Sequence, residues 1–315
     1  MLFKKNRGLS RFFRSRRNKI KFRAKKGGGF MTFIDFFAGV GGIRTAMEAA
    51  GHTCLGFVEI DRFAVASYRA IHDTKGEFYA SDIRAVDPVS LPAADIYTFG
   101  FPCQAFSISG RRLGLEDTRG TLIYEILRIA HIRQPKYLFA ENVAGLLTHD
   151  RGRTFRIILD AMGELGYFCE WQRINSAAFV PQSRPRVYIV GHHGAPPAYP
   201  VFPIIPQDAE PRLIWAGNLN IKGLFESANK VYSPDGISPC LDTSSDRPNI
   251  ILPDGRVRHL SALEKWRLQG FDDDAYYKAA AVCSDAQLQK QAGNGVSVPV
   301  IFEIAKRFRE IEGNK

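Results

Sequence analysis

The fold of this chain is decided by Thr32-Phe33-Ile34-Asp35-Phe36-Phe37-Ala38-Gly39-Val40-Gly41-Gly42. The β-branched and aromatic residues of its first half predict a buried strand, and a glycine-rich turn follows directly. Apolar residues then recur with helical spacing from 43 to 50, and Gly51 ends that helix. Strand, glycine-rich turn and helix in this order are typical of the first unit of a doubly wound α/β fold that cradles a phosphate or a nucleoside.

The turn is not the dinucleotide-binding fingerprint Gly-x-Gly-x-x-Gly, because Arg44 occupies the place of its third glycine. A tight turn of this kind can still admit an adenosine group that lacks a pyrophosphate, as in S-adenosylmethionine. The next strand, 53–58, ends in Glu59, which is placed to accept from both hydroxyls of a ribose. Asp82 lies at a further strand end, where it could accept from an exocyclic amine such as adenine N6. Taken singly, each carboxylate also fits a helix cap or a turn.

Strands and helices continue to alternate as far as Val190, which predicts a doubly wound, mostly parallel sheet. From Gly191 onward, prolines, glycines and scattered aromatic residues replace helical periodicity, so we place a domain boundary there. Helical patterns return at 261–268, opened by a capping box, and at 300–309. Up to Val190 the expected strands cover 32–37, 53–58, 95–99, 137–140, 168–174 and 187–190, and the expected helices cover 43–50, 62–71, 121–134 and 154–165.

A second distinctive stretch, Gly100-Phe101-Pro102-Cys103-Gln104-Ala105-Phe106-Ser107, follows the strand 95–99. A cysteine just past the carboxyl end of a strand lies where α/β sheets bind their ligands, and Pro102 stiffens the turn that presents it. Read alone, the thiol is equally well explained as a small buried hydrophobe. The Gly- and Arg-rich residues 107–120 that follow are typical of a mobile loop over a site.

Composition excludes several classes of protein. The 315 residues are 45% hydrophobic and 24% charged, which is typical of a soluble globular protein, and no apolar run or signal peptide indicates a membrane or export. Five widely spaced cysteines without a Cys-x-x-Cys pair indicate a reducing compartment and argue against disulfides and zinc. Because adjacent strand residues face opposite ways, we interpret His192-His193 as a solvated loop and expect no metal.

The positive charge is concentrated in residues 1–30, which hold twelve Lys and Arg residues and no acidic one. The remainder of the chain is near neutral and gives no electrostatic support for a nucleic-acid partner. The tail, set off by Gly27-Gly28-Gly29, is consistent with a disordered phosphate-binding arm, an organellar presequence, or upstream sequence that is not part of the natural product.

In this order, the motifs resemble the DNA (cytosine-5)-methyltransferases of the bacterial and phage modification type, over nearly all of 31–315. The blocks that carry the resemblance are Phe33–Arg44, Glu59, Asp82, Gly100–Ser107, Glu141-Asn142-Val143, Gln182–Arg186, Arg258–Phe271 and Gln291–Val296. The resemblance implies a Rossmann-like S-adenosylmethionine-dependent methyltransferase with a smaller, irregular, β-rich target-recognition domain. The implied parts are a basic disordered tail (1–30), a catalytic and cofactor-binding domain (31–191 with 286–315), and a target-recognition domain with a hinge (192–285, recognition within 192–257).

The resemblance also implies the reaction: a methyl group passes from S-adenosyl-L-methionine to C5 of a flipped-out cytosine in a specific duplex DNA sequence, and S-adenosyl-L-homocysteine is left. Cys103 would add to C6 as the nucleophile, Glu141 would hold a proton at N3, and Arg184 would bind O2, with Arg186 as a fourth catalytic residue. Implied cofactor contacts are Phe37 (on adenine), Ala38, Gly39, Gly41, Gly42, Glu59 (ribose), Ile60, Asp82 (adenine amine), Ile83, Pro102 and Asn294. Implied DNA contacts are Gln104, Ser107, Arg111 and Gln182.

Two features depart from the family pattern: Cys240 stands where threonine more often precedes leucine, and the basic tail lies upstream of the usual start. We expect a cytoplasmic monomer whose partner is duplex DNA, with a cognate restriction endonuclease as a candidate partner that forms no stable complex. Methylation of cytosine in transfer RNA is one rival reading, since related enzymes share the Pro-Cys motif. A catalytically silent DNA- or ligand-binding relative is another, although it would not need Cys103, Glu141 and Arg184 together.

Overall fold

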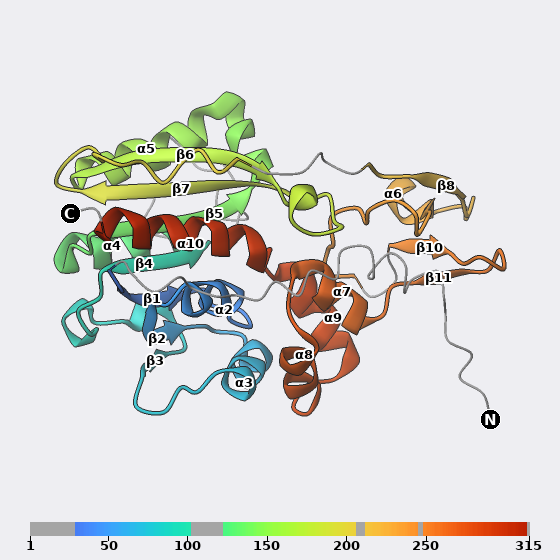
Figure 1. Cartoon of the computed structure of the whole chain (residues 1–315), viewed down its shortest axis with the longest axis horizontal. Helices are drawn as coiled ribbons and strands as arrows, with labels where there is room; N and C mark the ends of the chain where they lie inside the picture. The colour runs from blue at the N-terminus through green and yellow to red at the C-terminus, as the bar shows by residue number, and fades with distance from the viewer. Residues whose placement is uncertain (1–28, 102–121, 206–211, 245–247, 314–315) are drawn as a thin grey trace.

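The computed structural model describes residues 29–101, 122–205, 212–244 and 248–313. Every strand and helix expected between residues 32 and 190 is present, with ends that differ by a few residues (Figure 1). In chain order the elements are β1 (Thr32–Phe36), α2 (Gly42–Ala49), β2 (Thr53–Val58), α3 (Arg62–Ile71), β3 (Phe78–Ala80), β4 (Ile96–Gly100), α4 (Leu122–Arg133), β5 (Tyr137–Val143), α5 (Arg153–Glu164), β6 (Tyr167–Asn175), β7 (Pro185–His193), β8 (Trp215–Asn218), α6 (Glu226–Asn229), β9 (Lys230–Tyr232), β10 (Asn249–Ile251), β11 (Val257–His259), α7 (Ala262–Gln269), α8 (Asp273–Ala280), α9 (Asp285–Asn294) and α10 (Val298–Gly313).

The larger sheet has the strand order β3-β2-β1-β4-β5-β7-β6. Its strands run parallel from β3 to β5, whereas β7 is antiparallel to both of its neighbours. The predicted mostly parallel, doubly wound sheet is therefore confirmed. The chain changes direction across the sheet between β1 and β4, and α/β proteins bind their ligands at such a switch point, at the carboxyl ends of the strands.

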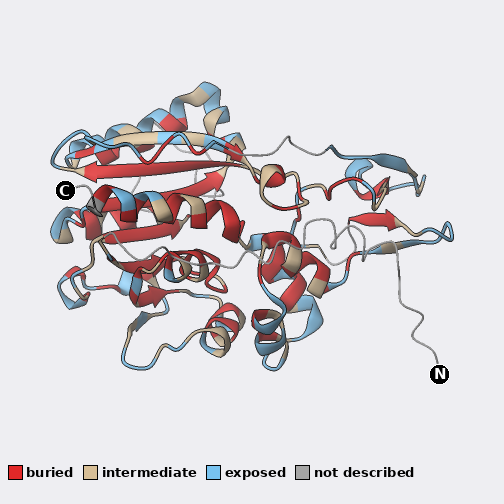
Figure 2. Ribbon diagram, viewed as in Figure 1, coloured by how far each residue is buried: buried red, intermediate tan, exposed pale blue. Residues whose placement is uncertain are grey.

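Both faces of this sheet are covered by helices, and alternate residues of each strand serve the two faces. Phe33 and Ile96 pack with α2 and α10, while Ile34 and Tyr97 pack with α4 and α5. Figure 2 shows the resulting band of buried strands between exposed helix surfaces. One acidic residue lies inside this core: Asp35 is fully buried, and its Oδ1 accepts a hydrogen bond from Thr98 Oγ1 at 3.0 Å.

A second sheet, β11-β10-β9-β8, lies at the end of the molecule that also carries α6 (Figure 1). Its strands have three or four residues each, and its small core joins Leu241, Ile250 and Leu260 to Leu268 of α7. The expected irregular, β-rich character of this region is thus confirmed. Its connections are long relative to its strands, which explains the weak periodicity of the sequence.

Several features between 192 and 294 were not expected. The helices α8 and α9 carry little apolar periodicity, yet Ala275 of α8 and Leu288 of α9 pack into the same core as α2 and α10. The segment 201–204 also belongs to that core and is held against β6 by Glu170 and Gln172. Thus parts of the region beyond Gly191 pack on the larger sheet.

The interpretation of His192-His193 as a solvated loop is wrong. Both residues end strand β7, and His192 is buried with its Nε2 2.7 Å from Glu170 Oε1. The two side chains do face opposite ways, since Tyr137 contacts the His192 ring and Tyr167 the His193 ring. Among the described residues, no helix combines the length and hydrophobicity needed to cross a bilayer.

Candidate active site

A cavity of about 1110 Å³ opens at the carboxyl ends of β1, β2, β4 and β5. Its lining includes the turn after β1, the ends of the neighbouring strands, the start of α3, the segment that enters β7, residues 242–243 and the end of α9. Among the predicted site residues it gathers Phe37, Ala38, Gly39, Gly42, Glu59, Ile60, Asp82, Ile83, Glu141, Arg184, Arg186 and Asn294. The fold therefore brings twelve of the predicted site residues, from positions spread over the chain, to one cavity.

The turn after β1 has an unusual backbone. Phe37 and Gly39 have positive φ angles of 53° and 56°, so the chain bends sharply where the cavity begins. Glu59 secures the bend: its Oε2 accepts from Gly39 N at 2.8 Å, and its Oε1 accepts from Asp61 N at 2.7 Å. The carboxylate is thereby fixed in orientation, with lone pairs left for a ligand. Gly41, also predicted here, does not line the cavity, because its Cα faces the ring of His72.

On the next strand connection, Asp82 caps a short 3-10 helix that starts at Ile83. Its Oδ1 accepts from Arg84 N at 3.0 Å, and its Oδ2 lies 2.6 Å from Arg84 Nη2. Ile60, which follows the adjacent strand β2, has 67% of its surface exposed although it lines the cavity. A carboxylate and an exposed aliphatic side chain that line the same cavity suit a flat heterocycle with an amino group.

The acid end of the cavity is built on β5. Glu141 lies at the end of this strand, and its Oε1 is 3.0 Å from Arg186 Nε, with each side chain only 11% exposed. Its parallel neighbour in β4 is Gly100, and its antiparallel neighbour in β7 is Tyr188. Burial raises the pKa of the Tyr188 hydroxyl, and the negative charge of Glu141 raises it further, so Tyr188 stays neutral beside the pair.

The neighbour of Glu141 positions the chain that leads to the predicted nucleophile. Asn142 is buried, and its Nδ2 donates to Phe101 O at 3.0 Å, two residues before Cys103. Its Oδ1 accepts from Val143 N at 2.8 Å, which fixes the amide orientation. Sequence analysis assigned Asn142 no role, although its place beside Glu141 in a motif was a usable signal. Several predicted site residues lie outside the described residues: Pro102, Cys103, Gln104, Ser107 and Arg111, together with the loop 107–120. Gly100 and Phe101, which directly precede them, are described and line the cavity.

The two arginines of the segment entering β7 have different surroundings. Arg184 is 3% exposed and donates to the carbonyl oxygens of Leu241 (3.2 Å), Gly293 (3.1 Å) and Gly295 (2.6 Å). Burial lowers the pKa of its guanidinium, and the charge of Arg186 lowers it further. Both terminal nitrogens of Arg184 are therefore bound to the backbone, whereas its buried Nε has no hydrogen-bond partner among the described residues. Its predicted contact with a base O2 stays a prediction, and Arg186, which pairs with Glu141 in the same cavity, is a second candidate for that contact.

Gln182 does not fit its predicted role as a DNA contact. The residue has no exposed surface, its Nε2 donates to Leu268 O at 3.0 Å, and its Oε1 accepts from Leu241 N at 3.1 Å. A side chain enclosed in this way cannot reach a nucleic acid in this conformation. Its position between a β-strand and α7 depends on contacts with distant parts of the chain, which local sequence pattern does not reveal.

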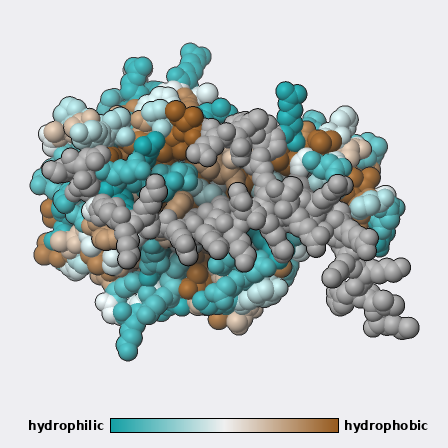
Figure 3. All heavy atoms as spheres, in the orientation of Figure 1, coloured by the Kyte–Doolittle hydropathy of each residue, from teal (hydrophilic) through white to brown (hydrophobic). Residues whose placement is uncertain are grey.

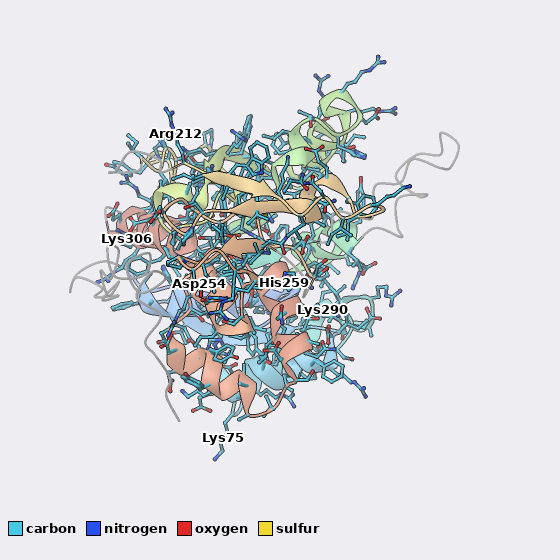
Figure 4. The ribbon with its side chains drawn as sticks, turned by 90° about the vertical axis from the view of Figure 1, so that its right-hand side faces the viewer. Lys75, Arg212, Asp254, His259, Lys290 and Lys306 are labelled. Carbon is cyan, nitrogen blue, oxygen red and sulfur yellow. The ribbon has the colours of Figure 1, made fainter. Side chains whose placement is uncertain are left out.

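Lys290 of α9 is a cavity residue that sequence analysis missed. Its Nζ lies 2.9 Å from Asp61 Oδ2, so an ion pair joins α9 to the N-terminus of α3 beside Glu59. Figure 4 views the molecule from the end of the smaller sheet and shows the labelled basic residues Lys75, Arg212, Lys290 and Lys306 well apart from one another. Lys290 therefore contributes a positive charge to the cavity, while Lys75, Arg212 and Lys306 lie apart from it and from one another.

Comparisons with known proteins agree over most of the chain. The sequence profile of the C-5 cytosine-specific DNA methylases matches residues 31–230 and 215–310. The type II methyltransferase M.NgoBI of Neisseria gonorrhoeae is 38% identical over 292 residues, covering 85% of this chain and 90% of that protein. M.HaeII of Haemophilus aegyptius is 36% identical over 296 residues, covering 86% and 91%. Among solved structures, the S. pombe Dnmt2 methyltransferase superposes with a TM-score of 0.68 at 17% identity, covering 88% and 97% of the two chains, which shows a shared fold.

Proposed function

Because this chain belongs to the C-5 cytosine-specific DNA methylases, and is thus a DNA (cytosine-5)-methyltransferase, we propose that it methylates a cytosine flipped out of one specific duplex DNA sequence through a covalent adduct of Cys103. The observation that carries this proposal is the buried pair of Glu141 and Arg186 in the same cavity as the turn after β1. One cavity thus offers an acid for a heterocycle and a separate place for an adenosyl group.

The chemistry of cytosine explains why such an acid is needed. C5 is a poor nucleophile until a thiolate adds to C6, and that addition builds negative charge on the ring. In the proposed mechanism the Cys103 thiolate adds to C6 while Glu141 holds a proton at N3. Arg186 keeps the carboxyl group oriented and offers its remaining N–H groups to O2. The electron-rich C5 then takes the methyl group that S-adenosyl-L-methionine supplies, which leaves S-adenosyl-L-homocysteine. A base removes the C5 proton, the C5–C6 double bond re-forms, and Cys103 leaves with the electron pair of its bond to C6.

The residues of the other half of the cavity fit S-adenosyl-L-methionine. When bound, it supplies an electrophilic methyl group. Glu59 is already oriented by Gly39 N and Asp61 N, and it can accept from ribose hydroxyls through its free lone pairs. Asp82 and Ile60 face the space where we place the adenine. We assign the adenine face to Phe37, whose positive φ turns the chain into the cavity.

Target recognition is assigned to residues 192–257, which contain β8, β9 and β10 of the smaller sheet. This end of the molecule exposes large apolar side chains, among them Trp215 at 64% and Phe225 at 81% (Figure 3). Exposed aromatic side chains suit contacts with base edges and unstacked bases more than with phosphates. The target base lies inside the duplex, so flipping it out costs a few kcal/mol, which these contacts would offset.

The proposal is tested with labelled S-adenosylmethionine and two acceptors, duplex DNA of mixed sequence and transfer RNA. We expect label in DNA alone, recovered as 5-methylcytosine after nuclease digestion and confined to one sequence. Label in transfer RNA alone would instead assign the activity to the RNA-modifying relatives. The label should also be lost in Cys103→Ser. Its matched thiol control is Cys169→Ser, because Cys169 lies on β6 away from the cavity and should be dispensable.

A further inference from the structure

The backbone of Leu241 is held on both sides by side chains from one short segment. Gln182 Oε1 accepts from Leu241 N at 3.1 Å, and Arg184 Nη1 donates to Leu241 O at 3.2 Å. Leu241 itself is buried in the core of the smaller sheet, whereas Gln182 and Arg184 directly precede β7 of the larger sheet. Two side chains therefore bind one residue of the smaller sheet's core at its N–H and its C=O.

The same two side chains also bind the ends of α7 and α9. Gln182 Nε2 donates to Leu268 O in the last turn of α7 at 3.0 Å. Arg184 Nη2 donates to Gly293 O and Gly295 O at the end of α9, where helix carbonyl groups lack partners and carry partial negative charge. The planar guanidinium of Arg184 reaches Leu241 with one nitrogen and the end of α9 with the other. A lysine could not do so as well, because its ammonium group presents all its donors from a single point.

The residues that flank Leu241 face the active site. Cys240 Sγ lies 3.8 Å from Arg186 Nη2, and Asp242 and Thr243 line the cavity. Gly293 packs directly against Asp242 O, so close that a Cβ on this glycine would overlap that atom. The place of 240–243 is thus set by Leu241 on one side and by the end of α9 on the other.

We infer that Gln182 and Arg184 act as positioning residues that clamp the Leu241 backbone and thereby hold 240–243 in register with the Glu141–Arg186 pair. The inference rests on the proposed function, since it concerns how the smaller sheet presents a target base to the acid. In this arrangement a loosened clamp leaves cofactor binding intact and disturbs the fit of the extruded cytosine. The clamp also explains why Gln182, which has no exposed surface, is not free to contact DNA.

Gln182→Met tests the clamp because it keeps the side-chain volume and removes both hydrogen-bonding groups. Its matched control is Gln172→Met, since Gln172 holds Ile204 N and Ile204 O in the same way on the outer strand β6. The measurements are melting temperature, affinity for S-adenosylhomocysteine, kcat and KM for DNA, and fluorescence of 2-aminopurine at the target position. We expect Gln182→Met to lose roughly tenfold in kcat, about the effect of losing the hydrogen bond to Leu241 N, which is the one of its contacts that holds 240–243, together with part of the 2-aminopurine signal. S-adenosylhomocysteine affinity should stay within about threefold, because Gln182 does not line the cavity.

The control separates positioning from stability. Gln172→Met should lower the melting temperature by a similar amount with kcat and the 2-aminopurine signal unchanged. Equal losses of kcat in the two variants, or native kcat in Gln182→Met, would overturn the clamp. Should Gln182→Met fail to fold, Arg184→Lys removes the other half and should lower kcat and the 2-aminopurine signal in the same way. If the native protein methylates no DNA, the proposed function fails first; native methylation with unaffected variants refutes the clamp alone.

Discussion

Asp35→Asn should stabilise this protein at neutral pH, against the usual effect of replacing a buried residue. Burial raises the pKa of the Asp35 carboxyl to about 8, although the hydrogen bond from Thr98 lowers it. Asp35 Oδ2 has no hydrogen-bond partner among the described residues. The folded protein therefore keeps this group protonated over a pH range in which the unfolded chain releases the proton.

The sign and size of the effect follow from proton linkage. The folded state binds one more proton than the unfolded state between the ordinary carboxyl pKa of 3.8 and about 8, so stability falls as pH rises through this range. Each pH unit costs about 1.4 kcal/mol, which amounts to about 4 kcal/mol at pH 7. Asparagine has no proton to release, but its amide would bury N–H groups without an acceptor at a cost of about 1–3 kcal/mol. At pH 7.5 the linkage has grown to about 5 kcal/mol, so the expected net gain is about 2–4 kcal/mol, and it should vanish between about pH 4.5 and 6.

Urea unfolding at pH 4.5 to 8, followed by tryptophan fluorescence, measures this difference directly. Trp266 is 1% exposed and reports on the core. Asp95→Asn is the matched control: although burial opposes it, hydrogen bonds from Thr32 and Lys136 lower the pKa of Asp95. Its contribution is present above the unfolded pKa and is lost as pH falls, so this variant should be less stable at neutral pH and approach the native protein in acid. Parallel stability curves for the native protein and Asp35→Asn across this range would refute the reasoning.

The remaining predictions concern the reaction. Cys103→Ser should abolish methylation while S-adenosylmethionine binding persists, and only the native protein should be trapped by 5-fluorocytosine DNA; trapping through another residue would contradict the mechanism. Glu141→Gln should lower kcat by several orders of magnitude with little change in DNA affinity, and kcat within about threefold of native would remove its assigned role. Exchanging 192–257 with the corresponding segment of a relative should change the methylated sequence and leave cofactor affinity unchanged; sequencing of methylated sites decides this. A protein that starts at Met31 should fold, methylate the same sequence and show a shallower salt dependence of DNA binding, whereas a changed target sequence would assign recognition to residues 1–30.

The sequence was sufficient where local pattern determines structure. Local apolar pattern located every strand of the larger sheet except the short β3, of which only the end near Asp82 was inferred. The glycine-rich turn with Glu59 located the half of the cavity that we assign to the cofactor. It was insufficient where a side chain chooses among distant partners. Arg184 donates to Leu241 O and Gly293 O, which are 57 and 109 residues away, so its motif could not predict these contacts.

The helices after residue 271 show the same limit. α8 is opened by Asp272, whose side chain accepts from Ala275 N, a cap that is visible in the sequence. Its Ala-, Asp- and Tyr-rich face carries too little apolar periodicity to indicate burial, and only the shared core with Trp266 explains why it forms. Likewise, the interpretation of His192 failed because its partner Glu170 belongs to another strand.

The late position of α9 and α10 in the chain has a consequence for protein synthesis. The cavity takes Gly293, Asn294 and Gly295 from the end of α9, and α10 packs in one core with β1 and α2, which are synthesised long before it. A nascent chain that ends before residue 295 thus lacks one wall of its active site even after the sheet has formed. Shortened products of interrupted translation should accordingly be inert, so a cell that makes this enzyme would not expose its DNA to an incomplete methylating protein.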